Sequence, residues 1–140
     1  MKKIFASISI LTFILMMSND LLANSIVTWS VVDVKSNELL PLGEKGSVQE
    51  AYLNNGLLPD PFQAENEALY QWMEEHKWTF KGKFIVRHDD VKQDHLILEF
   101  PSIDTYATIK VNGKVIGTTN NAFRTWRFNV KGLVQIGTNS

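Results

Sequence analysis

Residues 56–78 read GLLPDPFQAENEALYQWMEEHKW, a stretch that joins a Pro-Asp-Pro turn to an acidic helix start and several large aromatic side chains. Pro59 and Pro61 fix their own backbone φ angles and push the residues before them toward extended conformations. Residues 58–62 are therefore predicted to form a stiff, non-helical connector. This connector, residues 58–62, is called the elbow below, and a stiff segment of this kind is suited to holding a surface in one fixed shape.

A short amphipathic helix is predicted directly after the connector. Asn66 and Glu67 supply helix-start chemistry, because an asparagine side chain can cap the first turn and an acidic group there complements the helix dipole. Apolar and aromatic side chains then recur at helical spacing, which predicts a helix over residues 66–76. A second short helix is predicted over residues 47–55, where Gly56 supplies the stop.

Most of the remaining chain alternates between apolar and polar residues with period two, which indicates β-strands. The Asn112-Gly113 pair, placed between two such runs, is a strong signal for a two-residue hairpin turn. The ranges predicted as strands are 27–34, 78–86, 95–100, 107–111, 114–118 and 124–130. Together they predict a mainly β protein, an antiparallel β-sandwich with one or two short helices.

Residues 1–25 are predicted to be a signal peptide, and residues 26–140 one domain. Two lysines precede an almost continuously apolar run, and small residues follow at the positions that a signal peptidase reads. The alternative is a retained membrane anchor, although the apolar run falls short of the roughly 20 residues that a span needs. Export to a bacterial periplasm or medium is expected, with no stable membrane association after cleavage.

Charge and metal-ligand patterns exclude several classes of function. The formal net charge is −1, or −2 without the leader, so the chain lacks the basic character of a nucleic-acid-binding protein. It contains no cysteine, so no disulfide bond stabilises the fold. His88, Asp89, Asp90 and His95 are potential metal ligands, but without helix-spaced histidines a solvated polar turn is the favoured interpretation, and Asp94 belongs to the same loop. No metal and no cofactor is predicted.

Four motifs in register resemble the N-terminal domain of the beta-mannosidases of glycoside hydrolase family 2. They are residues 56–78, residues 100–107, the Asn112-Gly113 hairpin and residues 121–126. The resemblance covers roughly residues 29–139 and implies a jelly-roll, galactose-binding-like fold. It also implies that the two catalytic glutamates lie in a downstream barrel domain, which this sequence lacks. The intact enzyme would remove terminal β-D-mannose from β-mannoside oligosaccharides.

No catalytic residue is therefore predicted within the chain, and the candidate substrate-binding residues are Asp60, Asn66, Glu67, Asn121 and Arg124. Four of them have a structural alternative. Asp60 suits a turn, Asn66 a helix cap, Glu67 a first-turn acid, and Arg124 a bidentate clamp on Asp60 or Glu67. The aromatic residues of these motifs can stack on sugar rings, although Trp72 and Trp126 lie in patterns more typical of a core.

Two further features leave alternatives open. Where the family carries a histidine after a Gly-x-Val run, this chain has Gln49, which puts any substrate role of that position in doubt. Residues 132–140 look like a turn that introduces another strand, so the sandwich is expected to be truncated, with an unpaired sheet edge. A stand-alone carbohydrate-binding module and an inactive remnant remain the alternatives to an enzyme's N-terminal domain.

Overall fold

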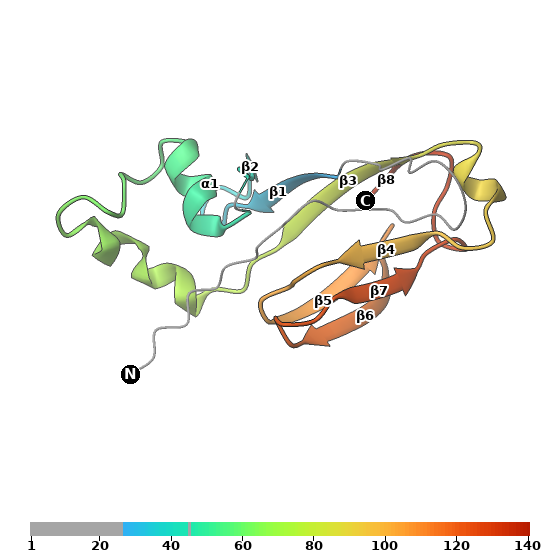
Figure 1. Ribbon diagram of the computed structural model, residues 1–140. Helices are drawn as coiled ribbons and strands as arrows, with labels where there is room; N and C mark the ends of the chain where they lie inside the picture. The colour runs from blue at the N-terminus through green and yellow to red at the C-terminus, as the bar shows by residue number, and fades with distance from the viewer. Residues whose placement is uncertain (1–26, 45) are drawn as a thin grey trace.

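The computed structural model describes residues 27–44 and 46–140 (Figure 1). The predicted signal peptide, residues 1–25, lies outside them, as does Lys45. Within this part of the chain, no helix is long and apolar enough to cross a membrane. The described residues form short antiparallel strands with one α-helix and two 3₁₀ helices, which confirms the predicted fold class.

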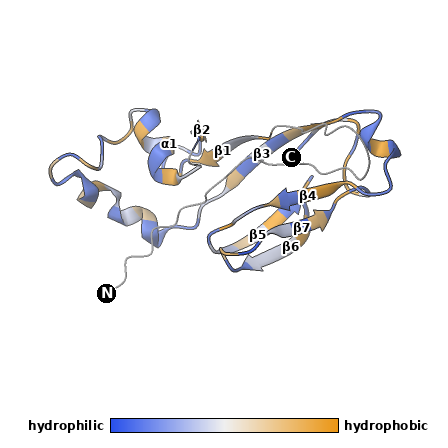
Figure 2. Ribbon diagram, in the orientation of Figure 1, coloured by the Kyte–Doolittle hydropathy of each residue, from blue (hydrophilic) through white to orange (hydrophobic). Residues whose placement is uncertain are grey.

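The largest sheet has four antiparallel strands in the order β2-β1-β3-β8. They are β1 (Thr28–Val32), β2 (Leu39–Pro41), β3 (Phe80–Val86) and β8 (Gly137–Asn139). Exposed residues alternate with partly or fully buried ones along β3, a strand that carries both hydrophilic and hydrophobic residues (Figure 2). Trp29 of β1 pairs with Gly82 of β3, where an added Cβ would lie 2.8 Å from the Trp29 ring, so this position requires glycine.

Two further strand pairs complete the β-sandwich. One joins β4 (Ile97–Phe100) to β7 (Trp126–Asn129), and the other joins β5 (Tyr106–Val111) to β6 (Lys114–Asn120). Positive φ angles of 48° at Asn112 and 82° at Gly113 confirm the predicted hairpin turn. Apolar side chains from several strands meet between the layers. This sandwich core comprises Phe84, Val86, Leu96, Leu98, Val111 and Val130.

Residues 132–140 were predicted to form a turn that introduces another strand, and they already contain the strand β8. Asn139 pairs with Phe84 of β3. One residue later, the Ser140 carbonyl accepts the Asn112 backbone N–H at 2.7 Å, and the Ser140 N–H donates to the Asn112 side chain at 3.1 Å. β8 therefore links the four-stranded sheet to the tip of the β5–β6 hairpin.

A second core lies at the other end of the molecule, beneath α1 (Val48–Asn54). The predicted boundaries of this helix are confirmed, because the Ser47 side chain accepts the Glu50 N–H and Gly56 has a φ of +69°. A set of buried side chains from the sheet and the helices forms this helical core. Its members are Val31, Leu40, Val48, Ala51, Tyr52, Tyr70 and Met73.

The helix predicted over residues 66–76 is present, but it is the 3₁₀ helix η1 (Asn66–Glu75) rather than an amphipathic α-helix. Its two buried residues, Tyr70 and Met73, are three positions apart. A turn of three residues aligns such a pair on one line facing the helical core. The Met73 carbonyl accepts both the His76 N–H and the Trp78 indole N–H, which ends the helix.

Candidate functional site

The elbow before η1 is held by side-chain hydrogen bonds to its own backbone. Asp60 accepts the Phe62 N–H on Oδ1 at 2.9 Å, and its carbonyl accepts the Asn66 amide at 2.9 Å. The Tyr70 hydroxyl donates to the Pro59 carbonyl at 2.7 Å. Burial and the negative charge of Asp60 raise the pKa of Tyr70, so this hydroxyl stays a donor at neutral pH. The connector is non-helical, as predicted, and these three hydrogen bonds brace it.

These contacts refine the interpretation of the candidate residues in the elbow. The prediction that Asn66 caps the helix is wrong, because Glu65 occupies that position without a side-chain bond and Asn66 instead ties η1 back to Asp60. Glu67 lies in the first turn of η1, as expected for an acidic residue there, and its side chain is exposed. Phe62, at the tip of the elbow, is 92% exposed.

The second group of candidates lies in the loop between β6 and β7. Asn121 accepts the Phe123 N–H on Oδ1 at 2.7 Å, and its carbonyl accepts the Trp126 indole N–H at 3.1 Å. The Arg124 guanidinium lies over the Trp126 ring, 4.2 Å from its centroid. This loop therefore has a fixed shape, and it presents Phe123 almost fully exposed, at 99%.

The structure does not form the predicted clamp between Arg124 and the elbow. Within residues 27–44 and 46–140, no hydrogen bond or ion pair joins Asp60 or Asn66 to Asn121 or Arg124. Arg124 is stacked on an aromatic ring rather than paired with a carboxylate. The candidates thus form two separately braced groups, one on the elbow and one on the β6–β7 loop.

The buried carboxylates of Asp33 and Glu99 form hydrogen bonds or ion pairs with neighbouring side chains. Glu99 of β4 forms an ion pair with Arg127, its partner in the β7 register. Asp33 accepts hydrogen bonds from the Tyr52 hydroxyl and from the backbone and side chain of Ser36. Burial alone would raise the pKa of Asp33, but these hydrogen bonds outweigh it and lower the pKa to about 2. Asp33 is therefore ionised at neutral pH and is unsuited to act as a general acid.

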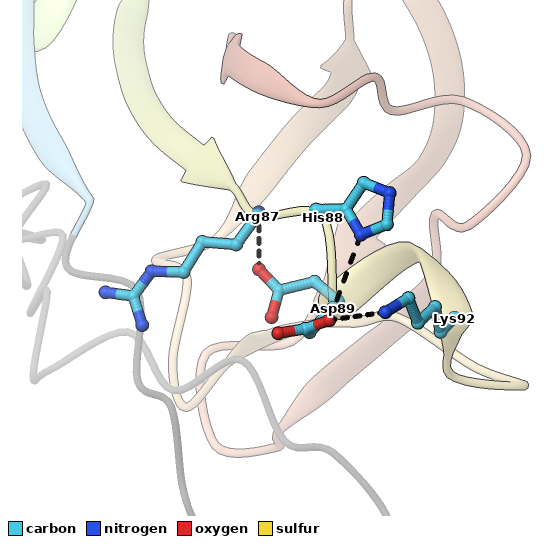
Figure 3. A network of polar contacts seen from close by, with 5 residues as sticks. Arg87, His88, Asp89 and Lys92 are labelled. Atoms are coloured by element: carbon cyan, nitrogen blue, oxygen red, sulfur yellow. Dashed lines mark hydrogen bonds and ion pairs between the residues drawn. The ribbon is translucent and has the colours of Figure 1, made fainter.

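The turn after β3 corrects the prediction that its acidic residues are all solvated (Figure 3). Asp90 is only 3% exposed, and its Oδ2 accepts the Arg87 N–H at 2.7 Å. Asp89 is exposed and pairs with Lys92 at 2.7 Å, which lowers the pKa of Asp89. Among the described residues, no group of three or more His, Asp or Glu side chains is arranged to hold a metal ion.

Sequence reasoning missed a small hollow beside the helical core. Its volume is about 130 Å³, and its walls come from the β1–β2 turn, α1, the chain after α1, and η1. The residues that line it are Asp33, Lys35, Tyr52, Leu57, Leu58 and Trp72. The pattern Asp33-x-x-Ser36 after a strand indicates a side-chain-stabilised turn. Asp33 and Tyr52 are 19 residues apart, and no sequence pattern connects them, so their hydrogen bond was not predictable from the sequence.

Comparison with known proteins identifies the type of domain. Residues 29–140 match the family described as glycosyl hydrolase 2 galactose-binding domain-like. Beta-mannosidases from Capra hircus and Rattus norvegicus are 30% and 31% identical over 107 and 108 residues, which are 76% and 77% of this chain. The chain spans only 12% of the length of each of these two relatives.

The crystal structure of a beta-D-mannosidase from Dictyoglomus thermophilum superposes with a TM-score of 0.74 at 41% sequence identity. The match covers 80% of this chain and 14% of that protein. The family match over residues 29–140 includes both cores and, apart from Thr28, every residue of the described strands. The chain therefore belongs to the glycosyl hydrolase 2 galactose-binding domain-like family.

Proposed function

We propose that this chain is the N-terminal, non-catalytic domain of a beta-mannosidase-like glycoside hydrolase. The single observation that carries the proposal is the family match over residues 29–140, shared with relatives named beta-mannosidase. In the proposed enzyme, a barrel domain outside this sequence holds the two catalytic glutamates and removes terminal β-D-mannose from β-mannosides. The present domain supports that barrel and contributes to the shape of the sugar pocket.

The chemistry of the described carboxylates supports a non-catalytic role. A retaining glycosidase uses two carboxyl groups about 5–5.5 Å apart, one of them an acid with a raised pKa. Asp33 has a lowered pKa, while Asp90 and Glu99 are committed to a turn and to an ion pair. The buried acids therefore act in folding rather than in bond cleavage.

Within the whole enzyme, the elbow and the β6–β7 loop are the proposed contributors to substrate binding. Asp60 and Asn66 brace the elbow, and Glu67 exposes a carboxylate on the adjacent turn. Asn121 and Arg124 brace the second loop, through a hydrogen bond to the Phe123 N–H and a contact with the Trp126 ring. Preorganised polar loops on a β-sandwich are suited to orienting sugar hydroxyl groups, because little ordering entropy is lost on binding.

A chimaeric enzyme tests the proposal directly. Residues 29–140 would replace the matching segment of the Dictyoglomus thermophilum beta-D-mannosidase, which has 41% identity and a TM-score of 0.74 to this chain. Hydrolysis of an aryl β-mannoside is expected in the chimaera and absent in the 140-residue chain alone. Deletion of the same segment from the thermophilic enzyme is expected to abolish activity or solubility.

Two matched variants sharpen the chimaera experiment. Glu67→Gln removes an exposed charge from the first turn of η1, next to the elbow, and Glu65→Gln removes a neighbouring exposed charge as the control. An increase in KM only for Glu67→Gln would support a role of the elbow in substrate binding. A folded chimaera without any hydrolysis, or a 140-residue chain that cleaves aryl mannosides by itself, would contradict the proposed division of labour.

We also propose that the protein is exported, with residues 1–25 removed as a signal peptide. The support is the order of a basic start, an apolar run and small residues before residue 26. Mass spectrometry of the protein from a bacterial periplasmic fraction should find a new N-terminus near residue 24 or 26. An intact N-terminus in the membrane fraction would contradict export and favour an anchor.

A further inference from the structure

The sequence contains two Asn-Gly pairs, Asn55-Gly56 and Asn112-Gly113. In a flexible chain this pair loses the asparagine side-chain amide most readily, because glycine has no side chain to hinder attack by its backbone nitrogen. Both asparagines are exposed, and both glycines have positive φ angles, 69° and 82°. The two pairs therefore share the same local chemistry, and a difference in their reactivity would come from the fold.

Deamidation at such a pair is a self-contained reaction in which water is the only co-reactant. The backbone nitrogen of glycine loses its proton and attacks the side-chain carbonyl carbon of asparagine. The leaving amide nitrogen takes up a proton and departs as ammonia, while the new C–N bond closes an imide ring. Water then opens the imide at either carbonyl and yields aspartate or isoaspartate. To reach the attacking position, the asparagine side chain must rotate toward its own peptide bond and release its hydrogen bonds.

Asn112 is held by segments that lie far away in the sequence. Its side-chain amide donates to the Leu133 carbonyl at 2.9 Å and to Asn139 Oδ1 at 2.8 Å, and its Oδ1 accepts the Ser140 N–H at 3.1 Å. The Asn112 backbone N–H also donates to the Ser140 carbonyl at 2.7 Å. The Asn139 side chain is only 2% exposed. Rotation of Asn112 therefore requires β8 and the turn before it to detach from the hairpin.

Asn55 is held by bonds within one helix end. Its side-chain amide donates to the Ala51 carbonyl at 2.7 Å. The Gly56 N–H donates to the Leu53 carbonyl at 3.0 Å, which is one of the two bonds of a Schellman cap. Helix ends open by fraying at little cost in free energy, and this end is exposed. Rotation of Asn55 therefore requires only the last turn of α1 to open.

We propose that Asn55 is a site of spontaneous deamidation and that the fold protects Asn112 from the same reaction. Within the described part of the chain, Asn112 must release three side-chain hydrogen bonds and Asn55 one. A typical hydrogen bond changes an equilibrium about fivefold, so Asn55 is expected to react roughly 25-fold faster in the folded chain. This reaction is independent of any hydrolytic activity of the proposed enzyme.

The products change the junction between α1 and the elbow. An aspartate at position 55 cannot donate to the Ala51 carbonyl, and its charge lies at the negative end of the α1 dipole, where the last turn has no basic residue. Isoaspartate also lengthens the backbone by a methylene group, which displaces the Gly56 N–H from the Leu53 carbonyl. The end of α1 is therefore expected to unwind, while the sandwich core stays intact.

Incubation of the folded 140-residue chain in mildly alkaline buffer, followed by peptide mapping with mass spectrometry, tests the proposal. The peptide that contains Asn55 should convert to aspartate and isoaspartate roughly 25-fold faster than the peptide that contains Asn112. In concentrated urea the two pairs should react at closely similar rates, because no fold protects either of them. Asn55→Gln should stop conversion of the first peptide, since a larger imide ring forms far more slowly. The neighbouring Asn54→Gln is the control and should leave the reaction of Asn55 unchanged.

A second variant tests whether β8 protects Asn112. Asn139→Ala removes one partner of the Asn112 side chain and should raise the rate at Asn112 about fivefold without changing the rate at Asn55. An unchanged rate at Asn112 would overturn the proposed protection. The proposal also fails if the folded chain shows less than a fivefold preference for Asn55, or if Asn55 stays intact while the urea-treated chain reacts completely. Unequal rates in urea would likewise overturn it, because the fold would then not be the cause.

Discussion

The sandwich core and the helical core are built on different principles. The sandwich core consists of aliphatic and phenylalanine side chains on strands whose positions are set by backbone pairing. The helical core relies on Tyr52, Tyr70 and neighbouring tryptophans, and on hydrogen bonds from side chains to the backbone. The sandwich core is therefore positioned by the register of its strands, whereas the helical core is positioned by the contacts of individual side chains.

The two ends also differ in how far apart along the chain their partners lie. In the elbow and η1, Asp60 bonds to Phe62 and Asn66, and Tyr70 bonds to Pro59, all within about one dozen residues. In the sandwich, Phe84 pairs with Asn139 and Leu98 with Phe128. Closing long loops is slow and entropically costly, so the elbow is expected to order before the sandwich does. These hydrogen bonds, between residues close in sequence, are expected to let the elbow keep its shape independently of strand pairing.

The largest effect is expected from Leu96→Ala, which empties a fully buried position of the sandwich core. Loss of the side chain and the resulting cavity should lower the free energy of unfolding by about 3 kcal/mol in urea denaturation. Val115→Ala, at a position that is 59% exposed, is the control and should change stability little. If amides of α1 keep their protection while the sandwich unfolds, the two cores are separate cooperative units.

Asn139→Ala should cost about 2 kcal/mol, because it removes the four hydrogen bonds of a side chain that is only 2% exposed. The Asn139 side chain accepts hydrogen bonds from Asn112 and from the Gln135 N–H, and donates to the Gln135 and Gly137 carbonyls. Thr138→Ala, on the same strand but exposed, serves as the control. Equal stability of the two variants would show that β8 contributes little to the sandwich.

Acid should weaken the helical core through Asp33. The folded pKa of about 2 lies below the ordinary value of 3.8, so the ionised carboxylate stabilises the fold fully above about pH 4. This contribution, on the order of 1–2 kcal/mol, should be lost as the pH falls from about 4 to 2. Measuring the midpoint of urea denaturation at several pH values in that range would check this loss of stability. Asp33→Asn should flatten this part of the profile, and an unchanged slope would contradict the assignment.

The smallest effect is expected from Tyr70→Phe, which removes the hydrogen bond to the Pro59 carbonyl. Stability should fall by about 1 kcal/mol, with a local rise in amide exchange around the elbow. Tyr106→Phe is a matched control, because that tyrosine is 84% exposed. A loss spread evenly over the sandwich amides would argue against independent bracing of the elbow.

Local signals in the sequence predicted much of this fold. Ser47 and Gly56 mark the ends of α1, Asn112-Gly113 marks the hairpin, and the alternation of residues locates most strands. The 3₁₀ character of η1 was not predictable, because it depends on aligning Tyr70 and Met73 with a core formed by distant segments. Short β2 and β8 were missed, since three residues are too few for a periodic pattern.

The candidate site was predictable to a smaller extent. The turn role of Asp60 follows from its neighbouring prolines and is confirmed by its bond to the Phe62 N–H. The stacking of Arg124 on Trp126 competes with a carboxylate clamp, and residue types alone do not decide between them. The burial of Asp90 and the pairing of Asp33 with Tyr52 depend on the packing of the folded chain. Polar residues in loops therefore reveal their partners only in three dimensions.

The placement of β8 has a consequence for biosynthesis. The first strands of the four-stranded sheet and the β5–β6 hairpin leave the ribosome well before Gly137–Asn139, which lies between them. A nascent chain that has emerged only as far as residue 136 exposes an edge of β3 that nothing yet occupies, and such edges attract other strands. Chaperone binding during translation is therefore most valuable in the short interval before Asn139 emerges.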